Sequence, residues 1–210
     1  MGEIKIGRTV LGYVMTNCYF VYDADTKNTL VIDPAYDGKG IYDKLTTNGL
    51  KVSAVLLTHG HFDHIMGVNE LRDVSGAKVY ASEAEESLLL DAHLNVSDQI
   101  GRPYTVKADV LLKDGEVVTI DGISFKTLAT PGHTKGSCCF YFENAGILVA
   151  GDTLFEGSVG RTDLPTGSAG TLNRSIKEKL MNLPDETKVY PGHGDATTIS
   201  QERMYNPFCQ

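Results

Sequence analysis

Short apolar runs recur along the whole chain, separated by polar turns that contain Gly, Pro, Asn or Asp. Runs of this length, rich in β-branched and aromatic residues, are typical of buried β-strands. They predict strands at residues 17–22, 29–32, 52–57, 77–81, 110–112, 116–120, 123–128, 137–142, 146–150 and 188–190. The dipeptides Asp114-Gly115 and Asp121-Gly122 lie between three of these runs and predict tight hairpins.

Apolar residues at helical spacing interrupt this strand pattern in two places. They are Ile65, Val68 and Leu71 directly after the run at 52–57, and Leu172, Ile176, Leu180 and Leu183 ahead of Pro184. Asp37 is expected to cap a further helix over residues 40–46, and Ser82-Glu83-Ala84-Glu85 has the form of a capping box. Strands and helices in this order suit two sheets packed face to face, with helices outside.

Two long polar segments, residues 93–107 and 153–168, show neither pattern. Loops of such length in a compact domain are usually either functional or mobile. We therefore expect these segments to contribute to a site or to move.

Composition places the chain among ordinary globular proteins. Its 210 residues fit one domain, and 41% of them are hydrophobic and 22% charged. The formal net charge of −8 argues against nucleic acid or an anionic membrane as a partner, because both require a basic surface. No apolar run approaches the length of a membrane span, and residues 1–9 lack the apolar core of a signal peptide. The sequence carries no signature of an oligomeric state.

The four cysteines, at positions 18, 138, 139 and 209, form no CxxC pair. Cys138 and Cys139 lie within an apolar run, which favours buried, reduced thiols and a reducing compartment. We therefore expect a cytoplasmic protein.

One stretch concentrates residues that bind metals. His59, His61, Asp63 and His64 fall within six residues, directly after the predicted strand at 52–57 and before a helical pattern. This position is the carboxyl end of a strand, where open α/β sheets place their ligands. Imidazole and carboxylate are the ligands of zinc, and of iron or manganese. His59 and His61 can point one way and Asp63 and His64 another, which would give two half-sites.

Three further candidate ligands follow predicted strands in the same way. His133 comes after Pro131-Gly132, Asp152 closes the run at 146–150, and His193 follows the run at 188–190. Taken singly, each of them would be read as an ordinary turn or capping residue. Their shared position at strand ends favours one site at one edge of the sheets.

The motif His59-x-His61-x-Asp63-His64, followed in order by Gly132-His133, Gly151-Asp152 and Gly192-His193, resembles that of the metallo-β-lactamase fold hydrolases. The resemblance implies an α/β protein with an αβ/βα four-layer sandwich: two mixed sheets with helices on both outer faces and a two-metal site at one edge. It further implies a ligand set in which His59, His61 and His133 hold the first metal, Asp63, His64 and His193 hold the second, and Asp152 bridges them. Zinc is the favoured metal, with iron and manganese as alternatives.

Within that superfamily, the segments at 151–155 and 160–163 resemble the glyoxalase II (hydroxyacylglutathione hydrolase) branch. Residues 1–210 are expected to form a single domain without the C-terminal helical domain of full-length glyoxalase II, as in the short glyoxalase II-like proteins. The resemblance gives Arg161 a substrate-binding role toward a carboxylate of the thiol. A competing interpretation is that Arg161 pairs with Asp163 and only staples the loop.

The resemblance and the ligand set together predict a metal-dependent hydrolase that acts on a small-molecule thioester, such as an S-2-hydroxyacyl glutathione. Two metal ions would acidify a water to a nucleophilic hydroxide, with Asp63 and Asp152 as the catalytic carboxylates that hold the ions. A thiolate leaves without a strong general acid, which favours thioesters over amides. Two alternatives stay open: a mononuclear iron persulfide dioxygenase, since that family shares the Gly-Arg-Thr-Asp segment, and a non-catalytic metal-binding protein.

Overall fold

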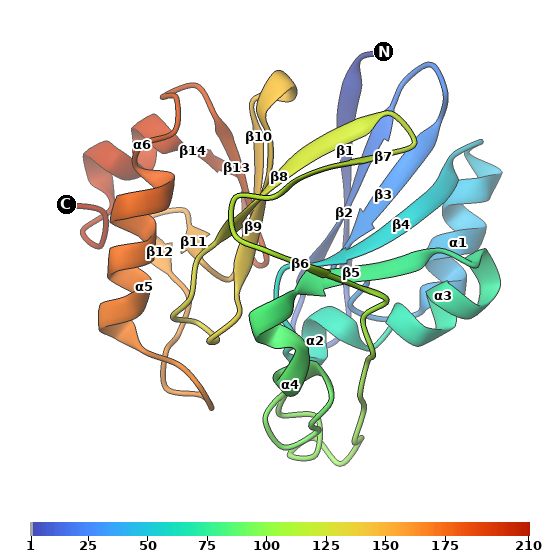
Figure 1. Cartoon of the computed structure of the whole chain (residues 1–210), viewed down its shortest axis with the longest axis horizontal. Helices are drawn as coiled ribbons and strands as arrows, with labels where there is room; N and C mark the ends of the chain where they lie inside the picture. Colours follow the sequence, from blue (N-terminus) through green and yellow to red (C-terminus); the bar gives the residue numbers. More distant parts are fainter. Residues whose placement is uncertain (1) are drawn as a thin grey trace.

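The computed structural model describes residues 2–210 and contains two six-stranded mixed sheets (Figure 1). The first sheet has the order β1-β2-β3-β4-β5-β6. Its strands are β1 (Ile4–Leu11), β2 (Thr16–Asp23), β3 (Asn28–Ile32), β4 (Lys51–Leu57), β5 (Lys78–Ser82) and β6 (Val110–Leu112). Pairing is antiparallel from β1 to β3 and parallel from β3 to β6.

The second sheet has the order β14-β13-β10-β9-β8-β7. Its strands are β7 (Val117–Ile120), β8 (Ile123–Ala129), β9 (Cys138–Phe142), β10 (Ile147–Gly151), β13 (Lys188–Pro191) and β14 (Thr197–Thr198). Only β10 and β13 pair in parallel. A separate hairpin of β11 (Leu154–Phe155) and β12 (Ser158–Val159) lies within the predicted loop at 153–168.

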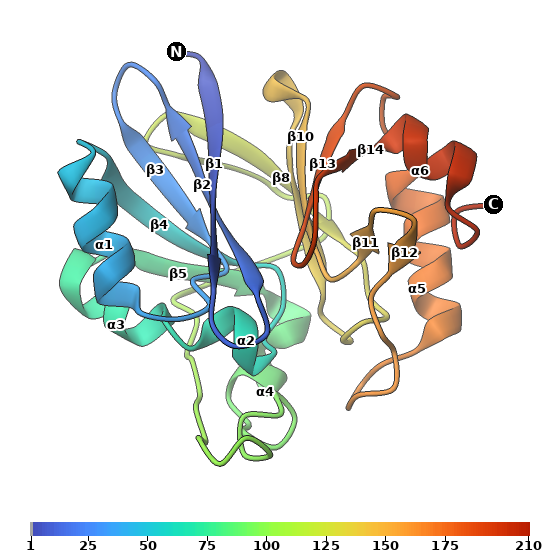
Figure 2. The same cartoon turned by 180° about the vertical axis from the view of Figure 1, so that it is seen from behind.

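Helices cover the outer faces of both sheets, as the two opposite views show (Figures 1 and 2). On the first sheet lie α1 (Gly38–Thr47) and α3 (Val68–Ser75); on the second lie α5 (Ala169–Ser175), which continues as a π-helical turn (Ile176–Leu180), and α6 (Ile199–Tyr205). Two short helices, α2 (Phe62–Ile65) and α4 (Glu86–Leu89), follow β4 and β5. Short 3₁₀ turns at Glu83–Glu85 and Glu143–Ala145 complete the described elements. None of the helices in residues 2–210 combines the length and hydropathy that a membrane span requires.

Three buried clusters separate the four layers. Neighbouring residues of β3 and β4 divide between them: Val31 and Val55 pack under α1 and α3, whereas Ile32 and Leu56 face the second sheet. A third cluster, which includes Leu172, lies between the second sheet and its helices. Strands that bury both faces need continuous apolar runs, which explains why these runs were visible in the sequence. The predicted αβ/βα sandwich of two mixed sheets with helices on both outer faces is confirmed.

Most predicted strands are present within one or two residues, and Asp37 caps α1 by accepting a hydrogen bond from Gly40 N at 3.1 Å. Asp121-Gly122 forms the β7–β8 hairpin with both φ angles positive, at 47° and 89°. The Asp114-Gly115 hairpin prediction is wrong, because this turn carries the chain from β6 in one sheet to β7 in the other. The strand β1 was not predicted, since Gly7 to Thr9 interrupt its apolar pattern.

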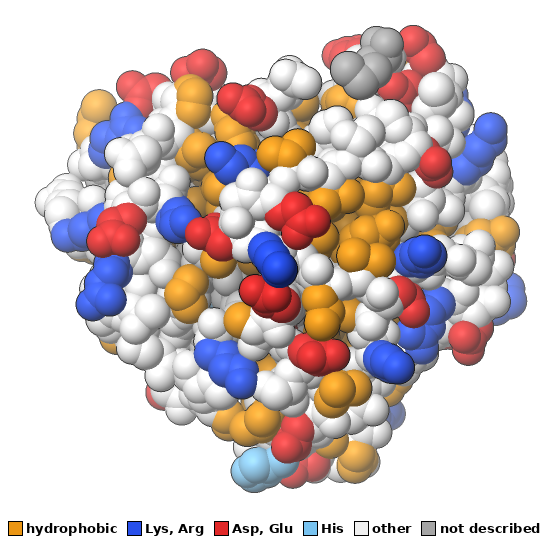
Figure 3. Space-filling model, viewed as in Figure 1, with side chains coloured by type: hydrophobic (Ala, Val, Ile, Leu, Met, Phe, Trp, Pro, Cys, Tyr) orange, Lys and Arg blue, Asp and Glu red, His pale blue; other side chains and the backbone are white. Residues whose placement is uncertain are grey.

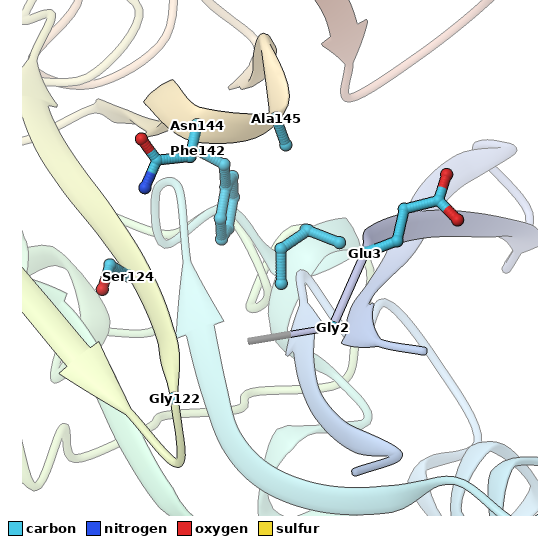
Figure 4. A pocket seen from close by; sticks show the side chains of 8 residues that line it. Gly2, Glu3, Gly122, Ser124, Phe142, Asn144 and Ala145 are labelled. Carbon is cyan, nitrogen blue, oxygen red and sulfur yellow. The ribbon is translucent and has the colours of Figure 1, made fainter. Parts of the chain in front are cut away.

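The two ends of the sandwich differ in chemistry. The carboxyl ends of β3, β4, β8, β10 and β13 meet at one edge, where all the predicted ligands lie. At the opposite ends of the strands, a hollow of ≈ 320 Å³ lies between the start of β1 and the turns before β8 and β10 (Figure 4). Phe142 and Ser124 line it, and among the described residues of its wall only Glu3 has a charged side chain. The candidate site is therefore the edge at the carboxyl ends of these strands.

Candidate metal centre

Seven predicted ligand side chains, carried by four different strand ends, converge on one cluster. Their potential ligand atoms form three overlapping groups in which all atoms lie within 4.8 Å of one another. The groups are His59, His61 and His133; His59, His64 and Asp152; and Asp63, His64 and His193. The structure therefore brings together every ligand that the sequence suggested, in two adjoining half-sites.

The first group, which we call the three-histidine half-site, is closed to solvent. His59, His61 and His133 are 1%, 3% and 1% exposed. His133 Nε2 lies 2.9 Å from His61 Nδ1 and 3.2 Å from His59 Nε2. Two nitrogens bound to one tetrahedral zinc at about 2.0–2.1 Å would lie about 3.3 Å apart, so these spacings fit a common ion. The planes of the three rings are nearly perpendicular, at 83° to 87°, so the rings do not stack face to face.

Burial favours the neutral form of all three imidazoles, which is the form that binds metal. It holds the pKa of His59 and of His133 below the ordinary value and lowers the pKa of His61 to about 3. The positive charge of neighbouring histidines adds to this effect for His59 and His61.

The second group, which we call the carboxylate half-site, lies nearer the surface. Asp63 Oδ2 is 3.2 Å from His193 Nε2 and 3.6 Å from His64 Nε2. The His193 side chain is 26% exposed and that of Asp63 is 14% exposed, whereas His64 is fully buried. Burial opposes the charged form of His64, but Asp63, Asp152 and Asp33 outweigh it and raise the pKa of His64 above its ordinary value.

Asp152 lies between the two half-sites. Its Oδ1 is 3.4 Å from His64 Nε2, and its Oδ2 is 3.6 Å from both His133 Nε2 and His193 Nε2. Burial opposes ionisation of Asp152, but His64 and the other imidazoles lower the pKa of this carboxyl. The carboxylate thus lies near imidazoles of both half-sites, with Oδ2 equally close to one imidazole of each, which is the arrangement of a bridging ligand. Gly192 permits this packing, because a Cβ there would lie 2.1 Å from Asp152 Oδ1.

The cluster fits two divalent cations. Within residues 2–210, His64 Nε2 and Asp152 Oδ1 are buried without a hydrogen-bond partner. A buried polar atom without a partner costs about 1–3 kcal/mol, and a cation in the cluster would satisfy both of these atoms. Histidine and aspartate serve zinc, iron and manganese alike, so the donor set leaves the identity of the metal open.

The outer nitrogens of three of the histidines, His59, His64 and His133, lie against groups that the motif did not predict. His64 Nδ1 donates to Asp33 Oδ2 at 2.9 Å, and His133 Nδ1 donates to the carbonyl of Arg161 at 2.7 Å. Thr58 Oγ1 lies 3.1 Å from His59 Nδ1. Such contacts orient these three rings, so that the other ring nitrogen of each faces the cluster.

Asp33 also holds the strand end that precedes the histidine motif. Its Oδ1 accepts from Thr58 N at 2.8 Å, and its Oδ2 accepts from Thr58 Oγ1 at 2.6 Å. Asp33 is 1% exposed and has a positive φ of 52°. The sequence carries a signal for this role, because Asp33 closes an apolar strand in the same way as Asp152.

Glu85 braces the three-histidine half-site from behind. Its buried carboxylate accepts hydrogen bonds at 2.9 Å from Gly60 N, Gly136 N and Thr134 Oγ1, which belong to the two loops that carry these histidines. Burial raises the pKa of Glu85 to about 7, against the effect of these three donors. The capping box predicted at 82–85 is wrong, because Ser82 makes no side-chain cap bond and Glu85 turns into the protein.

The start of β2 supports the carboxylate half-site. Thr16 Oγ1 donates to Asp63 Oδ2 at 3.0 Å. Asn17 Nδ2 donates to the carbonyls of Pro191 and Gly194, at 2.9 Å each, and so holds the turn that carries His193. Sequence reasoning missed Thr16 and Asn17, because neither belongs to a motif and each contacts a segment far away in the sequence.

The Arg161 side chain is 61% exposed and binds Asp163 through two hydrogen bonds, at 2.7 and 2.8 Å. The Arg161–Asp163 pair that the sequence offered as an alternative is therefore present, and the substrate-binding role of Arg161 stays a prediction. His93, the one histidine not expected at a strand end, is exposed and lies 3.0 Å from Asp98, outside the cluster.

Comparison with known proteins gives a consistent picture. The sequence pattern of the Metallo-beta-lactamase superfamily matches residues 11–193. The chain is 40% identical to the probable metallo-hydrolase YqgX of Bacillus subtilis, over 98% of this chain and 97% of that protein. It is 35% identical to the hydroxyacylglutathione hydrolase GloC of Haemophilus influenzae, over 91% and 92% of the two chains.

Two solved structures with high similarity cover nearly the whole chain. The BLEG-1 B3 metallo-beta-lactamase superposes with a TM-score of 0.93 at 40% identity, covering 98% of this chain and 100% of that one. TTHA1623 in a di-iron-bound form superposes with a TM-score of 0.86 at 33% identity, covering 96% and 99%. The second structure shows that a relative of this chain can hold two metal ions.

Proposed function

Because the chain belongs to the metallo-beta-lactamase superfamily and carries a cluster fitted to two metals, we propose that it is a two-metal hydrolase that cleaves thioesters. The substrate class that we propose is S-2-hydroxyacyl glutathione or a similar small thioester. The relative named hydroxyacylglutathione hydrolase supports this choice, at 35% identity.

The observation that carries the proposal is the position of Asp152 between the two half-sites, with its oxygens within 3.4 to 3.6 Å of His64, His133 and His193. Two divalent cations held there would supply an acidified water and polarise a substrate carbonyl. A single-iron oxygenase needs only two histidines and one carboxylate, so the complete carboxylate half-site favours the hydrolase.

The residues of the cluster also favour a thioester over an amide. Each acidic or imidazole side chain of the cluster is directed to one of the half-sites, so none is free to protonate a leaving group. A thiol has a pKa of about 8.5, and its thiolate therefore leaves without a proton donor, whereas an amine does not. The neutral imidazoles of the three-histidine half-site and the ionised Asp63 and Asp152 would hold the cations at the site.

Arg161 is proposed to bind a carboxylate of the thiol moiety in addition to Asp163. If Arg161 only binds the carboxylate, Arg161→Ala should raise KM for a carboxylate-bearing thioester with little change in kcat. If Arg161 instead only stabilises the loop through Asp163, the variant should lose activity equally on thioesters with and without a carboxylate, and its Tm should be lower. Equal losses on both substrates would contradict the binding role.

The proposal is tested by the metal content of the purified protein together with three assays. We expect two metal equivalents and hydrolysis of S-lactoylglutathione. One equivalent of iron with oxygen uptake on glutathione persulfide would instead identify a dioxygenase. Turnover of a β-lactam without thioester hydrolysis would contradict the choice of substrate.

A further inference from the structure

A second hollow, of ≈ 330 Å³, opens directly beside the carboxylate half-site, and Asp63 forms part of its wall. Phe62 and Met66, at the two ends of α2, continue this part of the wall, and the rest comes from three separate segments: the turn between β1 and β2, the segment after β3, and the long loop after α4. Its large apolar side chains are Tyr13, Val14, Tyr36, Phe62, Met66 and Ile100. The volume lies at the lower end of the range of about 300–1,000 Å³ for small-molecule sites, so the hollow suits a fragment of a substrate.

The apolar wall is unusually exposed for side chains of this size. Tyr13 is 90% exposed, Val14 48%, Ile100 43% and Tyr36 40%. Large apolar side chains grouped at the surface mark binding sites, because their exposure to water is unfavourable. A polar peptide such as glutathione would cover little of this wall.

One positively charged side chain, that of Arg102, lines the same hollow. Arg102 is exposed, and among residues 2–210 its side chain has no hydrogen-bond or ion-pair partner. Arg8 and Arg161, by contrast, each pair with a carboxylate. A guanidinium binds carboxylates through paired hydrogen bonds, so Arg102 is available to an anionic group of a ligand.

The loop that presents Arg102 is held in place by buried hydrogen bonds. Asn95 and Ser97 are fully buried, and the side chain of Asn95 donates to the carbonyl of Tyr104 at 2.8 Å. The Arg102 amide donates to the carbonyl of Ser97 at 3.2 Å, and the amide of Phe62, at the start of α2, donates to the carbonyl of Asn95 at 3.0 Å. The position of Arg102 is therefore coupled to the helix that carries Asp63, which lowers the entropic cost of binding.

We propose that this hollow binds a substrate moiety made of an apolar chain or ring that ends in an anion. The anion pairs with Arg102, the apolar part covers the exposed wall, and the thioester carbonyl lies at the half-sites beyond Asp63. This inference rests on the proposed function and names its substrate class: thioesters in which an apolar moiety carries a terminal carboxylate. That moiety can belong to the acyl part or to the thiol part.

Two matched substrate pairs test the inference and separate the two sources. The acyl pair is the monothioester of adipic acid with N-acetylcysteamine and the corresponding hexanoyl thioester. The thiol pair is the acetyl thioester of 6-mercaptohexanoic acid and its methyl ester. For the pair whose anionic part enters the hollow, Arg102→Gln should lower kcat/KM of the anionic member about tenfold or more, through KM. The neutral member should change less than about twofold.

Arg174→Gln, an exposed arginine on α5 outside the hollow, is the matched control and should leave all four rates unchanged. Ile100→Ser should weaken both members of the affected pair, because it removes part of the apolar wall. Equal effects of Arg102→Gln on the anionic and neutral members, or no effect on either pair, would overturn the inference.

Calorimetry with the non-hydrolysable thioether analogues gives a readout that does not depend on turnover. At least one anionic thioether should bind the wild-type protein about tenfold more tightly than Arg102→Gln. If the metal-loaded protein hydrolyses no thioester at all, the proposed function fails, and this binding difference still decides the inference. Turnover of S-lactoylglutathione with no binding of either anionic thioether would leave the function standing and overturn the inference.

Discussion

The two half-sites of the cluster differ in depth and in how their ligands are held. The three-histidine half-site has no side chain more than 3% exposed, whereas the carboxylate half-site includes His193, which is 26% exposed at its side chain. The deeper half-site is braced by Glu85 and by the Arg161 carbonyl. The shallower one is held by hydrogen bonds from Thr16 and Asn17, at the start of β2, and borders the apolar hollow.

This difference indicates that the two half-sites have different roles. A closed set of three neutral imidazoles, fixed by hydrogen bonds from behind, is suited to retain a cation. A partly exposed carboxylate and imidazole beside the hollow are suited to meet the substrate. We therefore expect the deeper half-site to bind its metal more tightly and the shallower one to govern turnover.

The largest effect is expected from removal of the residue that both half-sites share. Asp152→Ala should lower the metal content at both half-sites and reduce thioester hydrolysis by about 10³-fold or more, while the circular dichroism spectrum stays that of the folded protein. Metal analysis and single-substrate kinetics check this. Loss of one metal with activity retained would contradict a bridging role for Asp152.

A more selective change is expected from the carboxylate half-site alone. Asp63→Ala should cost at least about 10²-fold in hydrolysis and about one equivalent of metal, and the three-histidine half-site should keep its ion. Asp185→Ala, which removes an exposed carboxylate outside the cluster, is the control. A rate near that of the wild type in Asp63→Ala would favour a mononuclear enzyme.

The hydrogen bonds of Glu85 should affect the three-histidine half-site only. Glu85→Gln replaces one accepting oxygen by a donor, so it should weaken binding at the three-histidine half-site by about 10–100-fold and spare the other. Competition with a chelator measures both affinities. Glu83→Gln, in the same turn but exposed, controls for the loss of charge. Equal weakening of both half-sites would remove the distinction drawn between them.

The smallest effect is expected at Thr16, whose hydroxyl donates to Asp63 at 3.0 Å. Thr16→Val should weaken metal binding at the carboxylate half-site by roughly tenfold, the scale of one hydrogen bond to a charged group. Thr127→Val is a matched control, because the Thr127 hydroxyl is buried and finds no hydrogen-bond partner within residues 2–210. If the two variants behave alike, the Thr16 contact does not support Asp63.

The sequence predicted the candidate metal ligands better than the residues that hold them in place by hydrogen bonds. His59 to His64 are neighbours on one turn, and His133, Asp152 and His193 each end an apolar strand, so local patterns show them. The supports act through contacts between segments far apart in sequence. Glu85 lies in a stretch whose local pattern is that of a capping box, and only the packed loops at Gly60 and Gly136 turn its carboxylate inward.

In the fold, too, local patterns were predictable and tertiary features were not. Strands buried on both faces, such as β4, were visible as continuous apolar runs. In contrast, the partly exposed β1, with Lys5 and Arg8 among its residues, was missed, and the Asp114-Gly115 turn was misread because the sheet to which each strand belongs is a tertiary property. The proposed substrate contact at Arg102 is the least predictable part, since no motif marks this residue.

The central claim, that turnover requires both half-sites, is tested most directly by titrating the metal-free protein with zinc or ferrous iron. Bound metal and S-lactoylglutathione hydrolysis are measured in the same samples. The first equivalent should bind tightly with little turnover, and activity should rise in proportion to the second. Full activity at one equivalent, with no rise on further addition, would contradict the account.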